Sequence, residues 1–268
     1  MFHLGGRDFP ANAKQLRGAL TESFAGLLRL PPDKPIVIVQ GGAYPAVERI
    51  RVDLNGAVVE PGRKSLRPVG VGNPQPGITV ECLQIAGNPI RYQEAALTLA
   101  LAARDARFAF DRDIEGRPLL TLTEAQEGRV EAAISKADIE ALLLAGARAA
   151  AKSQGIAVEQ TQLTLTSQGS RSVGVDLRVR ARKGFLGATI RVKGRLDVDD
   201  ELNAQISGLT CDGEGMIGAM ACGFITPHLQ KFEGRQLPLM AFSLGDVRLR
   251  DLTLQVSDGL RVRAAFGS

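Results

Sequence analysis

Apolar and polar residues alternate with a period of two along most of the chain after residue 156, the spacing of half-buried β-strands. Residues 173–179 and 190–198 are the clearest runs, with aliphatic side chains at every second position except Gly194. Lys183 and Gly184 lie between these runs, where a tight turn is expected. Because the strands follow one another directly, we predict antiparallel pairing, with one apolar and one polar face.

The first half of the chain predicts further strands, but less regularly. Residues 95–109 are ambiguous, because their leucines alternate as in a strand while their alanines favour a helix, and we favour the strand. Residues 61–77 are basic and rich in proline and glycine, which is typical of a loop. The other expected strands are 36–40, 50–54, 78–85, a long strand over 119–134 that is interrupted near Gly128, 202–210, 237–242, 247–256 and 260–266.

Three segments have helical spacing. Residues 11–30 form an amphipathic pattern that ends at two prolines. A second helix is expected to begin at Ser135, with Asp138 completing a capping box. The third helix, over 216–232, is apolar on every side, so we expect it to be covered all round, and Pro227 predicts a kink in it. Its apolar part is shorter than the ~20 residues of a membrane span.

These elements predict an α+β fold in which a long, strongly curved antiparallel sheet wraps around helices. At 268 residues the chain can form one domain with a sizeable core, and we predict a single domain. Its expected parts are an N-terminal helix (1–35), a first sheet segment with the second helix (36–155), and antiparallel strands with the apolar helix (156–268).

Composition narrows the function. The net charge of +4 fits weak attraction to anionic surfaces, and the absence of tryptophan, with few other aromatics, argues against nucleic-acid binding. Cys82, Cys211 and Cys222 form no Cys-x-x-Cys pair and are interpreted as buried structural thiols. His3 lies in a terminus that we expect to fray. No metal spacing and no nucleophile elbow are found, so we expect no enzyme activity, no metal and no cofactor.

Four pieces of the chain, in this order, resemble the LmeA-like phospholipid-binding domain family of bacteria, whose architecture is related to tubular lipid-binding (TULIP-like) folds. They are the stretch from Gly41-Gly42 through 44–52, the strand and helix over 128–142, the apolar helix, and the closing segment that begins at Leu237-Pro238-Leu239 and ends in the hairpin of 246–262. The resemblance implies a TULIP-like fold and lipid binding in an apolar groove, and it transfers no catalytic motif.

The predicted function is therefore non-catalytic binding of a phospholipid or other acyl-chain lipid in an elongated apolar groove, for transport or membrane maintenance, with peripheral contact to an anionic membrane. A dry, close-packed core is the alternative use of the same apolar residues. The expected lipid-binding residues come from the three helices: Leu20, Phe24, Ile139, Leu142, Leu143, Ile217, Met220, Ala221, Phe224 and Ile225.

Basic residues of the 173–198 hairpin are the candidates for binding a lipid head group, although a solvated outer face is the simpler explanation for them. They are Arg180, Arg182, Lys183 and Arg191.

Two other functions remain open. The first is a protein-interaction or structural module with a filled core. The second is a nucleotide-dependent enzyme, because Gly213, Gly215 and Gly218 match the dinucleotide fingerprint between a strand and a helix. That fingerprint needs a parallel strand, whereas the flanking strands are expected to be antiparallel, so the glycines are better explained by a tight turn. The start of the chain has no apolar signal segment, which leaves a cytoplasmic, peripheral or exported location open.

Overall fold

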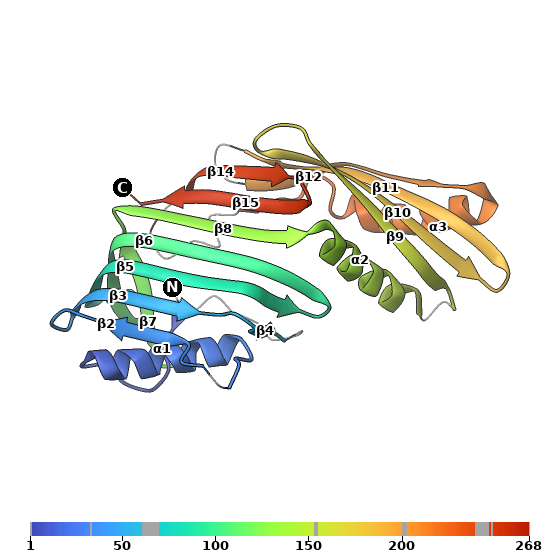
Figure 1. The fold of residues 1–268 in the computed structure, drawn as a ribbon. Helices are drawn as coiled ribbons and strands as arrows, with labels where there is room; N and C mark the ends of the chain where they lie inside the picture. The colour runs from blue at the N-terminus through green and yellow to red at the C-terminus, as the bar shows by residue number, and fades with distance from the viewer. Residues whose placement is uncertain are drawn as a thin grey trace. The chain divides into compact units, whose positions relative to one another are not determined.

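The computed structural model describes residues 2–32, 34–60, 70–152, 155–199, 203–238, 247 and 249–267. The fold is mixed α+β and mostly sheet, and its long sheet is open and curved (Figure 1). The chain divides into two compact units, which are described separately. Unit 1 comprises Met1–Ala132, Phe242–Leu252 and Arg263–Ser268, and unit 2 comprises Ala133–Ala241 and Thr253–Val262. The single domain stays a prediction.

The strands of unit 1 belong to a ten-stranded sheet whose main path runs β14-β15-β8-β6-β5-β3-β2, and parts of β8, β14 and β15 fall within the bounds of unit 2. The ambiguous segment 95–109 is a strand, as predicted, and pairs with β5 over most of its length. The strands are β1 (Phe2–His3), β2 (Val37–Gln40), β3 (Ala46–Asp53), β4 (Val58–Val59), β5 (Gln75–Tyr92), β6 (Ala95–Arg112), β7 (Pro118–Glu124), β8 (Glu127–Ser135), β14 (Leu249–Val256) and β15 (Gly259–Phe266).

The prediction of purely antiparallel pairing is wrong for part of this sheet. Strand β3 pairs with β5 in parallel, from Ala46 opposite Thr79 to Asp53 opposite Ala86, and β4 also pairs with β5 in parallel. A parallel neighbour needs a long connection, and residues 54–74 between β3 and β5 supply one. Residues 61–69 of the expected loop lie outside the described residues, and β5 already begins at Gln75.

The core of unit 1 is packed between the sheet and the helix α1 (Ala13–Leu27). Asn12 caps this helix, because its side chain accepts a hydrogen bond from the Gln15 amide at 3.0 Å. Leu16 and Leu20 are 0% and 3% exposed, so the first half of the predicted apolar stripe of α1 is covered, whereas Leu27 at its end is 43% exposed.

The strand predicted over 119–134 is interrupted, as expected, but the interruption precedes Gly128. The break lies at residues 125–126, between β7 and β8, whereas Gly128 is inside β8. A Cβ atom at Gly128 would lie 2.1 Å from the ring of Phe266. The glycine therefore serves close packing, a requirement that no local pattern reveals.

Unit 2 is built on a five-stranded antiparallel sheet in the order β13-β12-β11-β10-β9. The register puts aliphatic side chains on one face, since Leu177 lies opposite both Val192 and Leu163. Arginine and other polar side chains occupy the opposite face. The strands are β9 (Ala157–Ser167), β10 (Ser172–Lys183), β11 (Leu186–Val198), β12 (Asn203–Gly213) and β13 (Gln236–Pro238).

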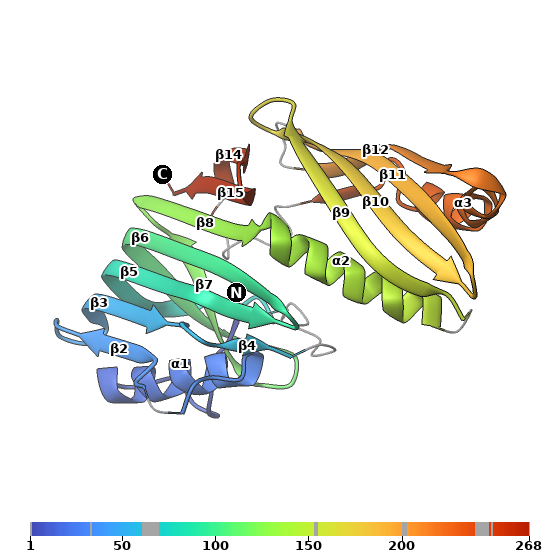
Figure 2. The same cartoon turned by 45° about the vertical axis from the view of Figure 1, so that its right-hand side comes forward.

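Helix α2 (Lys136–Ala151) begins as predicted. Ser135 is the N-cap, and its hydroxyl accepts a hydrogen bond from the Asp138 amide at 3.0 Å. The helix runs beside the edge strand β9 in both views (Figures 1 and 2). Three hydrogen bonds join them, including one from the Thr161 hydroxyl to the Glu140 carbonyl at 3.0 Å.

Helix α3 (Gly215–Gln230) is the predicted apolar helix, and it continues through Pro227. The expectation that it is covered all round is wrong. One side packs against β12 and β11, with Cys222 buried, while Met216 and Met220 on the other side are 82% and 60% exposed.

The interpretation of all three cysteines as thiols is also wrong. Cys211 of β12 and Cys222 of α3 form a disulfide with a Cα–Cα distance of 5.5 Å, and Cys82 is a free thiol. The helix returns along the strand that precedes it, which brings together two cysteines that are eleven positions apart. The disulfide fixes α3 on the apolar side of the sheet, because Cys211 lies opposite Val192.

Candidate functional site

The apolar face of the five-stranded sheet is the candidate site. We use the name "apolar face" for seven aliphatic residues of β9–β12. Each of them is only half-buried, even though α2 and α3 pack on this side. They are Leu165, Val175, Leu177, Val179, Val192, Leu196 and Leu209.

The two helices add side chains of the same kind and the same partial burial. The α2 residues Ile139, Leu142 and Leu143 are half-buried, and none of the described side chains of α2 is fully buried. Ile217, Ala221 and Ile225 of α3 are half-buried as well. Six of the predicted lipid-binding residues therefore lie on helices that pack against the sheet of unit 2.

The other predicted lipid-binding residues are placed differently. Leu20 belongs to the closely packed core of unit 1, and Phe24 packs against that core. Met220 points away from the sheet of unit 2 and is 60% exposed. Phe224 lies in α3, but its side chain is outside the described part of the chain.

The predicted head-group residues lie on the polar face, opposite the apolar one. Arg191 donates to both carboxylate oxygens of Asp176, with Nε–Oδ1 and Nε–Oδ2 distances of 2.9 and 3.1 Å. Arg180 and Arg182 both form ion pairs with Glu159, with Nε–Oε2 and Nε–Oε1 distances of 3.7 and 3.6 Å. Lys183 ends β10, and its side chain is outside the described part of the chain.

The Asp176–Arg191 pair is held firmly. The hydrogen bonds from Arg191 hold the pKa of the Asp176 carboxyl below its ordinary value, and the positive charges of Arg178 and Lys193 act in the same direction. Arg191 is therefore already committed to an internal partner, whereas the contacts of Arg180 and Arg182 with Glu159 are longer.

The glycine fingerprint forms a tight turn between β12 and α3, as the sequence indicated. A Cβ atom at Gly213 would lie 2.0 Å from the carbonyl of Gly218, so the two backbones are in contact. Gly215 has a φ of +71°, a conformation that glycine adopts readily. Strand β12 is antiparallel to both of its neighbours, which is not the setting of a dinucleotide site.

Unit 1 carries a hollow of about 720 Å³ on its sheet that the sequence analysis missed. Its floor includes small side chains, among them Ala86, Ala100 and Ala102. Arg263 and Glu131 are also among its lining residues and form an ion pair with an Nε–Oε2 distance of 2.8 Å. Ala86 of β5 and the alternating Ala100 and Ala102 of β6 were the signal for this hollow, because small residues flanked by long ones leave a depression.

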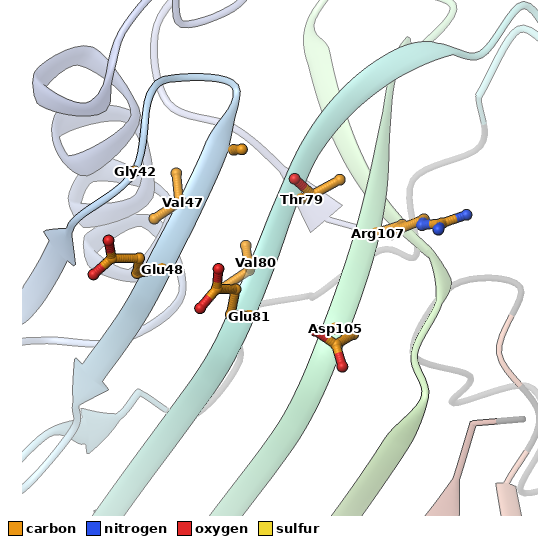
Figure 3. Close-up of a pocket in the computed structure, with 9 residues that line it drawn as sticks. Gly42, Val47, Glu48, Thr79, Val80, Glu81, Asp105 and Arg107 are labelled. Atoms are coloured by element: carbon orange, nitrogen blue, oxygen red, sulfur yellow. The ribbon is translucent and has the colours of Figure 1, made fainter.

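A second hollow of about 360 Å³ lies over β3, β5 and β6. Figure 3 shows Glu48, Glu81 and Asp105 on these neighbouring strands, with the guanidinium of Arg107 extending away from the glutamates. All three carboxylate residues are exposed, so water solvates them. Within the described ranges, no group of three or more histidine, cysteine, aspartate or glutamate side chains could hold a metal ion.

His3 belongs to a paired strand, so the expectation that it lies in a frayed terminus is wrong. His3 pairs with β7 through β1, and its Nε2 lies 2.8 Å from Oδ2 of the buried Asp113. Burial alone would raise the pKa of Asp113, but hydrogen bonds from Arg117, His3 and the Glu115 amide hold it well below its ordinary value. The cluster is structural, since Arg117 and the backbone saturate the carboxylate.

No protein-family model, no curated protein and no solved structure matches this chain. The described helices include none that is both long enough and apolar enough to span a membrane.

Proposed function

We propose that the protein binds a phospholipid or another acyl-chain lipid on the apolar face of unit 2, without catalysing a reaction. The supporting observation is the contrast between the units. In unit 1, Leu16 and Leu20 of α1 are 0% and 3% exposed, whereas none of the described side chains of α2 is fully buried. The seven residues of the apolar face stay half-buried, although Leu163 and Val173 on the same side of the sheet are buried. The apolar face therefore offers contact area that the chain's own side chains leave uncovered.

The dimensions of the face suit an acyl chain. Strand β10 has 12 residues and is about 40 Å long at ~3.3 Å per residue. Half of a ~30 Å hydrocarbon core, the length of one lipid tail, is about 15 Å. Each buried methylene contributes about 0.8 kcal/mol relative to water. A tail that leaves a bilayer for this face exchanges one apolar environment for another, which suits transport or membrane maintenance better than tight capture.

We assign head-group binding to the end of the β10–β11 hairpin. Arg182 and Lys183 lie at this end, opposite Gly187 and Leu186. Arg191 is a weaker candidate, because binding a lipid phosphate would require it to release Asp176. A cationic group at the end of an apolar strand can contact a phosphate while the tail lies along the face.

The TULIP-like architecture and the relation to the LmeA-like family belong to the same proposal. A curved sheet with helices on its apolar side agrees with both. The Cys211–Cys222 disulfide supports an exported or periplasmic location, because structural disulfides persist mainly in oxidising compartments.

Displacement of a fluorescent fatty acid from the purified protein tests the proposal. Leu142→Arg places a charge on the half-buried side of α2 and should abolish probe binding. Ala137→Arg places the same charge on an exposed position of another face of this helix, and this variant should bind the probe normally. Native mass spectrometry of the gently purified protein should also detect a bound lipid. Equal probe binding by the two variants, or a protein that carries no lipid and binds no probe, would instead favour a structural module with a filled core.

A further inference from the structure

The end of unit 2 at the β10–β11 turn exposes large apolar side chains. Phe185, in the turn, is 92% exposed, and Leu186 beside it is 48% exposed. Met216 and Met220, in the first two turns of α3, are 82% and 60% exposed. Folding usually buries such side chains, so four exposed ones at one end of a unit indicate a surface that contacts a partner or a membrane.

The four residues belong to the same end of the sheet. The turn follows Lys183, which lies opposite Leu186 in the register. The amide of Glu214 donates to the carbonyl of Thr189 at 2.9 Å, so α3 begins beside β11 only three residues from Leu186. Figure 2 shows the start of the orange helix and the β10–β11 turn at the same end of this sheet. We call Phe185, Leu186, Met216 and Met220 the apolar tip.

The outward side of α3 extends the apolar tip without adding a charge. Helix α3 contains no lysine, arginine, aspartate or glutamate. Ala219, Gly223 and Pro227, which share the outward side with Met216 and Met220, are exposed as well. This side of the helix is consequently an uninterrupted apolar stripe, as on helices that lie in a membrane interface.

Positive charge predominates in the hairpin that ends at the apolar tip, and one exposed acidic residue, Glu214, directly precedes α3. The hairpin segment 178–195, which has Phe185 and Leu186 at its centre, contains no acidic residue. Lys152, at the C-cap of α2, is exposed close to the start of β9, and β9 begins opposite Arg182. The basic residues of the segment are Arg178, Arg180, Arg182, Lys183, Arg191, Lys193 and Arg195.

We propose that the apolar tip docks unit 2 onto an anionic phospholipid bilayer, with Phe185 and Met216 entering the interface and the flanking cations contacting lipid phosphates. The inference rests on the proposed function, because docking would place the end of the apolar face at the surface from which a lipid is taken. A bilayer satisfies both parts of the surface at once, since its interface accepts apolar side chains and its anionic head groups attract lysine and arginine.

Tryptophan fluorescence tests the docking directly, because the chain contains no tryptophan. Phe185→Trp introduces a single reporter at the tip, and Ile114→Trp introduces a matched reporter at an 84% exposed position of unit 1. Vesicles of phosphatidylcholine mixed with phosphatidylserine should shift the emission of the first variant to shorter wavelength and leave that of the second unchanged. Brominated lipid should quench only the first. Equal responses from both reporters, or none from either, would overturn the inference.

Binding measurements complete the test. Phe185→Ser should weaken co-sedimentation with the mixed vesicles about tenfold, whereas Ile114→Ser should leave it unchanged. Added salt should weaken docking, and vesicles of phosphatidylcholine alone should bind poorly. Self-association that Phe185→Ser abolishes, without vesicle binding by the parent protein, would mean that the tip contacts a second copy instead.

Failure of the docking inference is distinguishable from failure of the proposed function. Phe185→Ser should still bind the fluorescent fatty acid in the absence of vesicles, because the apolar face is unaltered. If the parent protein docks onto vesicles but does not bind the fatty acid, the docking inference is upheld and the lipid-binding proposal is refuted.

Discussion

Removing the Cys211–Cys222 disulfide should destabilise unit 2 by an amount that follows from the chain length it closes. The two cysteines are eleven positions apart. The loop-entropy relation for a cross-link of this length gives about 2.8 kcal/mol at 25 °C. Because the bond also holds α3 against the sheet, the loss should appear in unit 2, while the core of unit 1, around Leu16, retains its packing.

Urea denaturation of the parent protein and of the Cys211→Ser/Cys222→Ser double variant measures this quantity. The double variant should unfold at lower urea, and a reductant should destabilise the parent but not the variant. Cys82→Ser is the matched control, because Cys82 is the free cysteine and its removal leaves the disulfide intact. Thiol titration of the unfolded, unreduced parent should find one thiol. Three thiols, or the same urea midpoint with and without reductant, would refute the reasoning.

Three further predictions concern unit 1 and α2. Gly128→Ala should destabilise the protein, because the new Cβ would lie 2.1 Å from the Phe266 ring. Gly146→Ala, in open space on α2, should instead stabilise the protein by up to about 1 kcal/mol, and the melting temperatures of the two variants compare these effects. Leu16→Ala, at a 0% exposed position, should cost about 2–5 kcal/mol in urea denaturation. Because folding lowers the pKa of Asp113, the ionised carboxylate stabilises the fold above pH ~4, and this stabilisation is lost as the pH falls through the pKa of the folded state. Asp113→Asn should therefore lower the melting temperature at neutral pH and have little effect in strong acid.

Local signals predicted the elements that depend on local chemistry. The start of α2 follows from Ser135 and Asp138, because the Ser135 hydroxyl accepts a hydrogen bond from the Asp138 amide and donates one to the Asp138 carboxylate. The alternating leucines of residues 95–109 correctly predicted a strand, despite the helical propensity of the alanines, because the pleat of β6 places alternate residues on opposite faces. The α+β class and the antiparallel sheet of unit 2 followed from the same periodicity.

Features that depend on distant residues were missed. The disulfide requires α3 to fold back on β12, and the parallel pairing of β3 with β5 requires a long connection between strands that are far from adjacent in sequence. Phe185 and Met216 are apolar, so periodicity alone could not tell that they are exposed. The candidate site was found in part, because α2 and α3 lie on the apolar side while Leu20 is buried in the core of unit 1.

The contact between α2 and β9 also bears on how copies of this protein can associate. An edge strand normally presents free amides and carbonyls to which a foreign strand can add. Here the Glu140 side chain already accepts the Leu163 amide at 2.6 Å, and Arg148 donates to the Val158 carbonyl at 3.0 Å. These contacts occupy two backbone groups of β9 that an added strand would need, so α2 hinders strand addition, and with it fibre-like association, at this edge.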